Sequence, residues 1–202
     1  SILGLFAVLT RDYGVRLFWP YGDGDIFKQH AKFDCSPMEK LYLINFLAYY
    51  VVDVFFIHTQ TDKKTIALHH VATLGLIAEG LVVQCPELNL LIMILHDIVD
   101  VPLYLGKCFT YAGYIKQREV SLVVFAAMCT YFRMINLPVL CSNMIWNRPK
   151  YVIHSATLYD ISIGFLCLLY FCHVLWFGDI LKAAKGLFIN GDKGAIRDNR
   201  SD

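Results

Sequence analysis

The stretch from Ile66 to Ile77 reads IALHHVATLGLI, and it places two adjacent histidines, His69 and His70, in an otherwise apolar run. A polar ring loses its hydrogen bonds to water in such surroundings, and burying it is unfavourable unless it is paired, bound to a ligand or used in a reaction. The composition of the whole chain indicates whether this run belongs to a soluble core or to a membrane span.

The composition favours a membrane protein. Of the 202 residues, 57% are hydrophobic, 14% are aromatic and only 17% are charged, and the mean hydropathy is +0.50. A soluble domain of this length has too little interior to bury so much apolar surface. The formal net charge of +1 gives no electrostatic case for a nucleic-acid partner, and no phosphate-binding GKS/T loop is present.

Five stretches are long enough to cross a bilayer, which takes roughly 20 mostly apolar residues. They lie at residues 38–58, 66–83, 87–106, 119–140 and 157–179, and residues 1–10 would be the end of a sixth. The predicted fold is all-α, a polytopic membrane helix bundle of about five to six transmembrane helices around a polar cavity. Residues 1–37 are an N-terminal segment and surface loop, 38–182 the transmembrane domain and 183–202 a polar tail.

The basic residues predict an orientation for this bundle. One side of the membrane would carry the basic tail together with Lys63, Lys64, Lys107, Lys116 and Arg118. The other side would carry Arg11, Arg16, Lys28, Lys32, Arg148 and Lys150. The bias favours the first side as cytosolic. Cys35, Cys85 and Cys141 then share the opposite side, where a disulfide between two of them and three unpaired thiols are both open.

A second group of ionisable residues lies in LHDIVDVPLYLGK, residues 95–107. His96 and Asp100 are four residues apart and share a helix face. Ionisable groups inside a span usually face the bundle interior or a wet cavity. Because successive spans alternate in direction, six residues are predicted towards the cytosolic side of the bundle, with His96 about one helical turn deeper than Asp100. These six are Asp53, His69, His70, His96, Asp100 and His173.

Such a cavity suits acyl transfer. A histidine can act as a general base or as a nucleophile that carries an acyl group, and a neighbouring carboxylate can hold its tautomer. Apolar walls would hold a hydrocarbon chain. Two alternatives remain open at this point. The histidines and aspartates could bind zinc with an open position, or they could be satisfied polar groups that join helices.

The pattern resembles the TLC-domain family and, within it, the ceramide synthases. The residues that carry the resemblance are Asp62, His69, His70 and Thr73, then His96, Asp97 and Asp100 in the next span, followed by Lys107 and Tyr111. FRMINLP, with Arg133 and Pro138, and CHVLW, with His173 and Trp176, resemble later family stretches. The resemblance covers nearly all of the chain from about Leu41.

The resemblance implies N-acylation of a sphingoid base by acyl-CoA, which yields ceramide and free CoA, in the endoplasmic reticulum. One histidine of the pair His69 and His70 would be the base or acyl carrier, His96 would assist, and Asp97 and Asp100 would orient groups and balance charge. The implied substrate-binding residues are Asp53, Asp62, Thr73, Lys107, Arg133 and His173. No metal or organic cofactor is implied, since acyl-CoA is a substrate; the expected partners are membrane lipids and copies or subunits of a membrane complex, without nucleic acid.

A second class of function fits one departure from the family. The segment between AYYVVDVFF and the histidine pair is short, and its basic run is reduced to TDKK. A non-catalytic TLC-domain protein, which binds lipid or serves as an accessory subunit of a larger membrane complex in the mitochondrial inner membrane, is therefore the alternative hypothesis.

Overall fold

The computed structural model describes residues 36–60, 62–82, 86–146 and 155–189, and the regular structure in these ranges is entirely helical. The helices are α2 (Pro37–Phe56), which continues into the 3-10 helix η2 (Ile57–Thr59), α3 (Lys63–Val82), α4 (Pro86–Tyr111), α5 (Ile115–Met128), the π-helix η3 (Cys129–Asn136), α6 (Leu137–Trp146) and α8 (Ala156–Ile189). The α5, η3 and α6 segments follow one another without a break.

Five of these helical stretches are long and apolar enough to cross a membrane. They are Pro37–Thr59, Lys63–Val82, Leu88–Tyr111, Ile115–Trp146 and Ala156–Gly186. The predicted all-α class and the five predicted spans are confirmed. The fourth span begins at Ile115 rather than at residue 119, and the last helix continues to Ile189. These longer ends include polar residues such as Lys116. A lysine at a helix end is compatible with a membrane span, because its long side chain can extend towards water.

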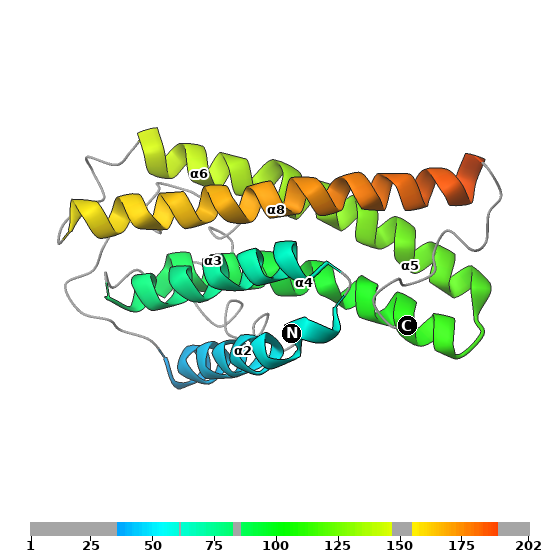
Figure 1. Ribbon diagram of the computed structural model, residues 1–202, viewed down its shortest axis with the longest axis horizontal. Coiled ribbons are helices and arrows are strands. Elements are labelled where there is room, and N and C mark those ends of the chain that lie inside the picture. The colour runs from blue at the N-terminus through cyan, green and yellow to red at the C-terminus, as the bar shows by residue number, and fades with distance from the viewer. Residues whose placement is uncertain (1–35, 61, 83–85, 147–154, 190–202) are drawn as a thin grey trace.

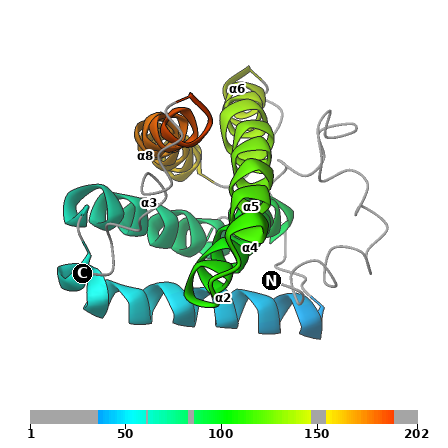
Figure 2. The ribbon, with the colours of Figure 1, turned by 90° about the vertical axis from the view of Figure 1, so that its right-hand side faces the viewer.

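The chain reverses direction at each joint between spans, as Figure 1 shows. The start of α3, the end of α4, the start of α5 and the end of α8 therefore lie towards one end of the molecule. Helix α3 packs against α8, α4 packs along α5, and α2 contacts both α3 and α4. Figure 2 looks nearly along α8 and shows α2 crossing the bundle at a steep angle to it.

Local sequence signals explain where two of these helices begin and end. Helix α2 starts with a capping box, in which Glu39 N donates to Ser36 Oγ at 3.3 Å and Ser36 N donates to Glu39 Oε2 at 2.6 Å, and Pro37 occupies the first turn, where no partner for its nitrogen is needed. Helix α4 ends at Tyr111, and Gly113 in the turn that follows has a φ of 76°, a conformation that glycine adopts without strain. This short turn makes α4 and α5 antiparallel neighbours.

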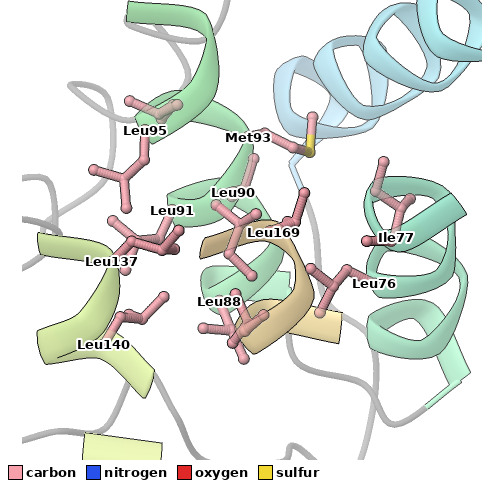
Figure 3. Close-up of a cluster of buried hydrophobic side chains, with 14 of the residues drawn as sticks. Leu76, Ile77, Leu88, Leu90, Leu91, Met93, Leu95, Leu137, Leu140 and Leu169 are labelled. Carbon is pink, nitrogen blue, oxygen red and sulfur yellow. The ribbon is translucent and has the colours of Figure 1, made fainter. Parts of the chain in front are cut away.

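Helix α4 lies at the centre of the apolar core. Its residues are buried almost continuously from Leu88 to His96, and Figure 3 shows Leu91 and Leu95 of α4 close to Leu137 at the start of α6. Leu76 of α3 and Leu169 of α8 belong to the same cluster. Because α4 is enclosed by its neighbours, the polar residues that follow Leu95 are delivered into the interior of the bundle.

The outer surface is strongly apolar. Helix α2 exposes residues such as Ile44, Val52 and Phe55, and α5 exposes Val120 and Val123. Exposing so much apolar surface to water is energetically unfavourable, whereas the hydrocarbon region of a bilayer is a favourable environment for it. Together with the five candidate spans, this surface identifies the chain as an integral membrane protein.

Several expectations concern residues outside the described ranges. Arg11, Arg16, Lys28, Lys32, Arg148 and Lys150 lie there, as do Cys35, Cys85 and the polar tail after Ile189. Cys141 is a buried free thiol in α6. The basic residues at the start of α3, near the end of α4 and at the start of α5 do lie towards one end of the bundle, as predicted, and the assignment of that end to the cytosol stays a prediction.

Candidate functional site

Three histidines from three different helices meet inside the bundle. His69 lies on α3, His96 on α4 and His173 on α8, and all three side chains are buried. The ring centroids are 5.6 Å apart for His69 and His96, 5.5 Å for His69 and His173, and 5.0 Å for His96 and His173. We call these three residues the histidine cluster. Residues far apart in sequence thus form one compact group of imidazoles.

Several ring nitrogens of the cluster have no hydrogen-bond partner in the part of the chain that the structure describes. His96 Nδ1 lies 2.6 Å from the carbonyl oxygen of Ile92; a carbonyl can only accept, so Nδ1 carries the hydrogen and Nε2 keeps its lone pair. Among the residues that the structure describes, neither His96 Nε2 nor either ring nitrogen of His173 has a hydrogen-bond partner. Such buried polar atoms are uncommon in native proteins and call for a ligand, a water or a reaction.

His70 faces away from the cluster, although it is adjacent to His69. Its Nδ1 lies 2.8 Å from the carbonyl oxygen of Ile66, and its Nε2 lies 2.8 Å from Asp53 Oδ2 on α2. The contact between His70 Nε2 and Asp53 is not aligned as a hydrogen bond. It is an ion pair when the imidazole is protonated. Successive residues of an α-helix are about 100° apart around the axis, so the two imidazoles necessarily face different neighbours.

Two aromatic side chains border the histidines. The Tyr50 ring lies 5.1 Å from the His70 ring and 6.0 Å from the His69 ring, and the Trp176 ring lies 5.0 Å from the His69 ring. Trp176 Nε1 donates to Asp62 Oδ2 at 3.1 Å. Asp62 precedes α3 and is exposed, so this hydrogen bond ties the start of α3 to α8 at the edge of the site.

The two aspartates of α4 are bonded to other helices. Tyr42 Oη donates to Asp97 Oδ2 at 2.7 Å, which links α4 to α2. Arg133 Nη2 lies 2.6 Å from Asp100 Oδ1 and also donates to the carbonyl oxygen of His96 at 3.1 Å. These contacts hold α4 in position and balance the charge of a buried guanidinium, and they place the carboxylates beside the histidine cluster rather than within it.

Arg133 reaches α4 from the π-helix η3. A π-helix takes more residues per turn than an α-helix, is rare and often marks a functional position. Pro138, the second residue of α6, cannot donate a backbone hydrogen bond to the preceding turn, so the ladder of the α5–η3–α6 segment is altered at this level. The altered turn directs a buried arginine, 9% exposed, towards Asp100 and the backbone of His96.

Two further predicted substrate-binding residues have structural contacts. Thr73 is buried, and its Oγ1 donates to the carbonyl oxygen of His69 at 2.8 Å. Lys107 Nζ lies 5.9 Å from the centroid of the Tyr104 ring, within the range of a cation–π contact. Thr73 therefore contacts the backbone at His69. Lys107 lies towards the end of α4, beyond Asp100.

The structure also contains a buried polar pair that the sequence reasoning missed. Ser162 on α8 donates a hydrogen bond to Glu79 Oε2 on α3, and both residues are buried. The signal was an acidic residue in the apolar run LIAEGLVV, which should have been read as an intramembrane polar site. Tyr42 and Tyr50 were missed as well, because an aromatic residue in a span gives no separate signal.

The fold and the site together define a class of protein: a polytopic helix bundle with a buried histidine cluster and paired aspartates. The sequence profile described as "TLC domain", which covers the TRAM, LAG1 and CLN8 proteins, matches residues 1–182. The chain belongs to the TLC-domain family, as the histidine and aspartate motifs predicted.

Several of the similar proteins are named as ceramide synthases or as a sphingosine N-acyltransferase. The chain is 28% identical to human ceramide synthase 5 over 198 residues, which cover 94% of this chain and 50% of that protein. It is 24% identical to sphingosine N-acyltransferase lag1 of Schizosaccharomyces pombe, with 99% of this chain and 53% of that protein covered, and 24% identical to mouse ceramide synthase 3, with 98% and 52% covered. The chain thus spans about half the length of these curated relatives. No solved structure matches the chain.

Proposed function

We propose that the chain carries the active site of a ceramide synthase-like N-acyltransferase, which moves a fatty acyl group from acyl-CoA to the amine of a sphingoid base. The observation that carries this proposal is the histidine cluster, because three imidazoles lie buried within a membrane bundle and His96 Nε2 and both ring nitrogens of His173 have no hydrogen-bond partner among the described residues. The names of the similar proteins support the reaction. The endoplasmic reticulum membrane is the proposed compartment, since acyl-CoA would reach the site from the cytosolic side.

The chemistry requires an acceptor for one proton. The amine nitrogen of the base attacks the thioester carbonyl, a C–N bond forms, the C–S bond breaks, and the proton lost by the amine reaches the departing thiolate. His69 is the proposed base or acyl carrier, because its ring lies 5.6 Å from that of His96 and 5.5 Å from that of His173 and so can exchange a proton with either neighbour. His96 Nε2, whose lone pair is directed away from Ile92 by the hydrogen bond at Nδ1, is placed to accept a proton in turn.

The other predicted residues take supporting roles in this proposal. His70 and Asp53 form a pair that fixes the rotation of α3 against α2. Asp97 and Asp100 hold α4 and balance the charge of Arg133. Thr73 fixes the backbone at His69. Asp62, which precedes α3, and Lys107, which lies near the end of α4, are the candidates for contact with the polar parts of the substrates.

The experiment is turnover by the purified full chain in detergent, with labelled acyl-CoA of several chain lengths and a long-chain sphingoid base. We expect an N-acylated base, identified by mass spectrometry, together with free CoA. A folded, monodisperse protein that forms no N-acyl product across all chain lengths would contradict the proposal.

One observation favours a second candidate. Both aspartates of the HDxxD stretch are engaged by Tyr42 and Arg133, as they would be in a bundle whose polar residues only join helices. The second candidate is a non-catalytic TLC-domain protein that binds lipid or is an accessory subunit of a membrane complex, with the mitochondrial inner membrane as its proposed location. Stoichiometric lipid that copurifies with an inactive, folded chain would favour it over the enzyme.

A further inference from the structure

We propose that the histidine cluster is a binding site for one divalent transition-metal ion of the zinc type, and that an ion bound there blocks acyl transfer. The second clause rests on the proposed function, whereas the first does not. The site consists of His69, His96 and His173, one residue from each of α3, α4 and α8.

The geometry of the ring nitrogens carries the first step. Each of the three histidines offers one nitrogen, and these nitrogens lie within 4.8 Å of one another. Zinc binds imidazole nitrogen at about 2.0–2.1 Å, so three nitrogens around a tetrahedral ion are about 3.3 Å apart. Closing the cluster on an ion therefore requires these nitrogens to approach one another by up to about 1.5 Å.

The hydrogen bonding of the cluster suits a metal ligand. A metal-bound histidine usually donates its other ring N–H to a carbonyl or carboxylate, which fixes the tautomer and the ring orientation. His96 does this, since its Nδ1 lies 2.6 Å from the carbonyl oxygen of Ile92, and Nε2 has no partner in the described part of the chain. His173, 1% exposed, has no partner for either nitrogen there. An ion would satisfy one nitrogen on each ring.

The chemistry of the ligands selects the kind of ion. Three neutral imidazoles suit zinc and its neighbours in the transition series, whereas calcium and magnesium require oxygen ligands. Three histidines also leave the fourth zinc position open. The positive charge of Arg133 is the main electrostatic opposition, and Asp100, 2.6 Å from its guanidinium, offsets it.

The consequence for the proposed reaction follows from a single lone pair. His69 needs a free ring nitrogen to accept a proton or to carry an acyl group, and an ion coordinated by that nitrogen occupies it. Zinc should therefore inhibit the transferase, and a chelator should restore the activity.

Metal content of the full chain tests the site. The protein in detergent is stripped with a chelator, loaded with zinc or cobalt, desalted and analysed for metal per chain. We expect about one ion per wild-type chain, the visible absorption of tetrahedral cobalt, and binding in His96→Gln and His173→Gln that is weakened by more than the roughly 10- to 100-fold typical of losing an outer-shell partner, because each change removes a ligand. His58→Gln is the matched control, because His58 is exposed and its Nδ1 bonds only locally, to the carbonyl oxygen of Phe55, and it should bind as the wild type does.

The outcomes separate the two claims. A wild-type chain that retains no more metal than His173→Gln, or that gives no tetrahedral cobalt spectrum, overturns the site even if a variant fails to fold, because the spectrum needs no variant. Turnover that persists while one zinc ion is bound overturns the blocking of acyl transfer. A chain that binds zinc but has no transferase activity without zinc keeps the metal site and contradicts the proposed function instead.

Discussion

His69 and His70 are adjacent, yet their imidazoles serve different neighbours. His69 lies among His96, His173 and Trp176, whereas His70 faces Asp53 on α2. The resemblance to the TLC family predicted that both histidines matter without separating their roles. Helix geometry alone indicates that they diverge, but which of them faces the other histidines depends on the packing of α8, and this packing is not visible in the sequence.

The contact between His70 and Asp53 can be tested by an isosteric change. In Asp53→Asn the charge is lost while the shape is kept, so we expect a loss of about 1 kcal/mol in stability and a clear fall in turnover. Thermal unfolding in detergent and an acyl-transfer assay measure the two effects. Asp179→Asn is the control, because Asp179 pairs with Lys182 on the exposed part of α8 and should change neither. Equal behaviour of the two variants would contradict a role for the pair.

Arg133 should be more important for stability than an exposed arginine. In Arg133→Met the carboxylate of Asp100 and the carbonyl of His96 lose their donor, and removing one partner of a buried pair costs about 3 kcal/mol or more. Because the Asp100 side chain is 35% exposed, water reduces the loss, and we expect about 2 kcal/mol. A melting temperature equal to that of the wild type would show that the pair is not needed to hold α4.

At the level of the elements, the five spans were predictable because a bilayer demands long apolar runs. Their ends were less so: the fourth span was predicted to begin at residue 119, whereas α5 already begins at Ile115. The π-helix η3 could not be predicted from FRMINLP, because Pro138 indicates an altered hydrogen-bond ladder but does not specify a π-helix. The family resemblance implied a substrate-binding role for Arg133, but the sequence did not predict its contact with Asp100.

The interface between α3 and α8 depends on a small residue at one position. A Cβ added to Gly75 would lie 2.6 Å from two ring atoms of Phe165, so Gly75→Ala forces the ring or the helix to move. We expect a loss of about 1–3 kcal/mol in stability, as for other overpacked interiors. Gly164→Ala is the matched control on the facing helix, because no atom lies within 4 Å of its added Cβ.

Thermal unfolding of the two alanine variants in the same detergent measures this difference. Gly164→Ala should be neutral or slightly stabilising, because alanine favours the helix over glycine. If Gly75→Ala unfolds at the same temperature as Gly164→Ala, the close approach of α3 and α8 at Phe165 is wrong.

For the molecule as a whole, the convergence of the predicted site residues was foreseeable in part. The alternation of spans predicted that His69, His96 and His173 lie towards the same side of the bundle, and the structure brings these three together. The sequence could not indicate which faces of the helices meet. The spans are apolar on several sides, so the pattern of hydrophobic residues does not select one face for packing. The pairing of Glu79 with Ser162 could not be predicted for the same reason, although the acidic residue in an apolar span indicated a buried polar contact.

The central claim is that the imidazole of His69 acts as the base or the acyl carrier when an acyl group moves from acyl-CoA to a lipid amine. The most direct measurement compares initial rates of N-acyl product formation by the wild type, His69→Gln and His58→Gln, each shown to be folded by its thermal transition. We predict a fall of about 10²-fold or more in His69→Gln and a rate within about twofold of the wild type in His58→Gln. Folded His69→Gln with wild-type turnover would contradict the account.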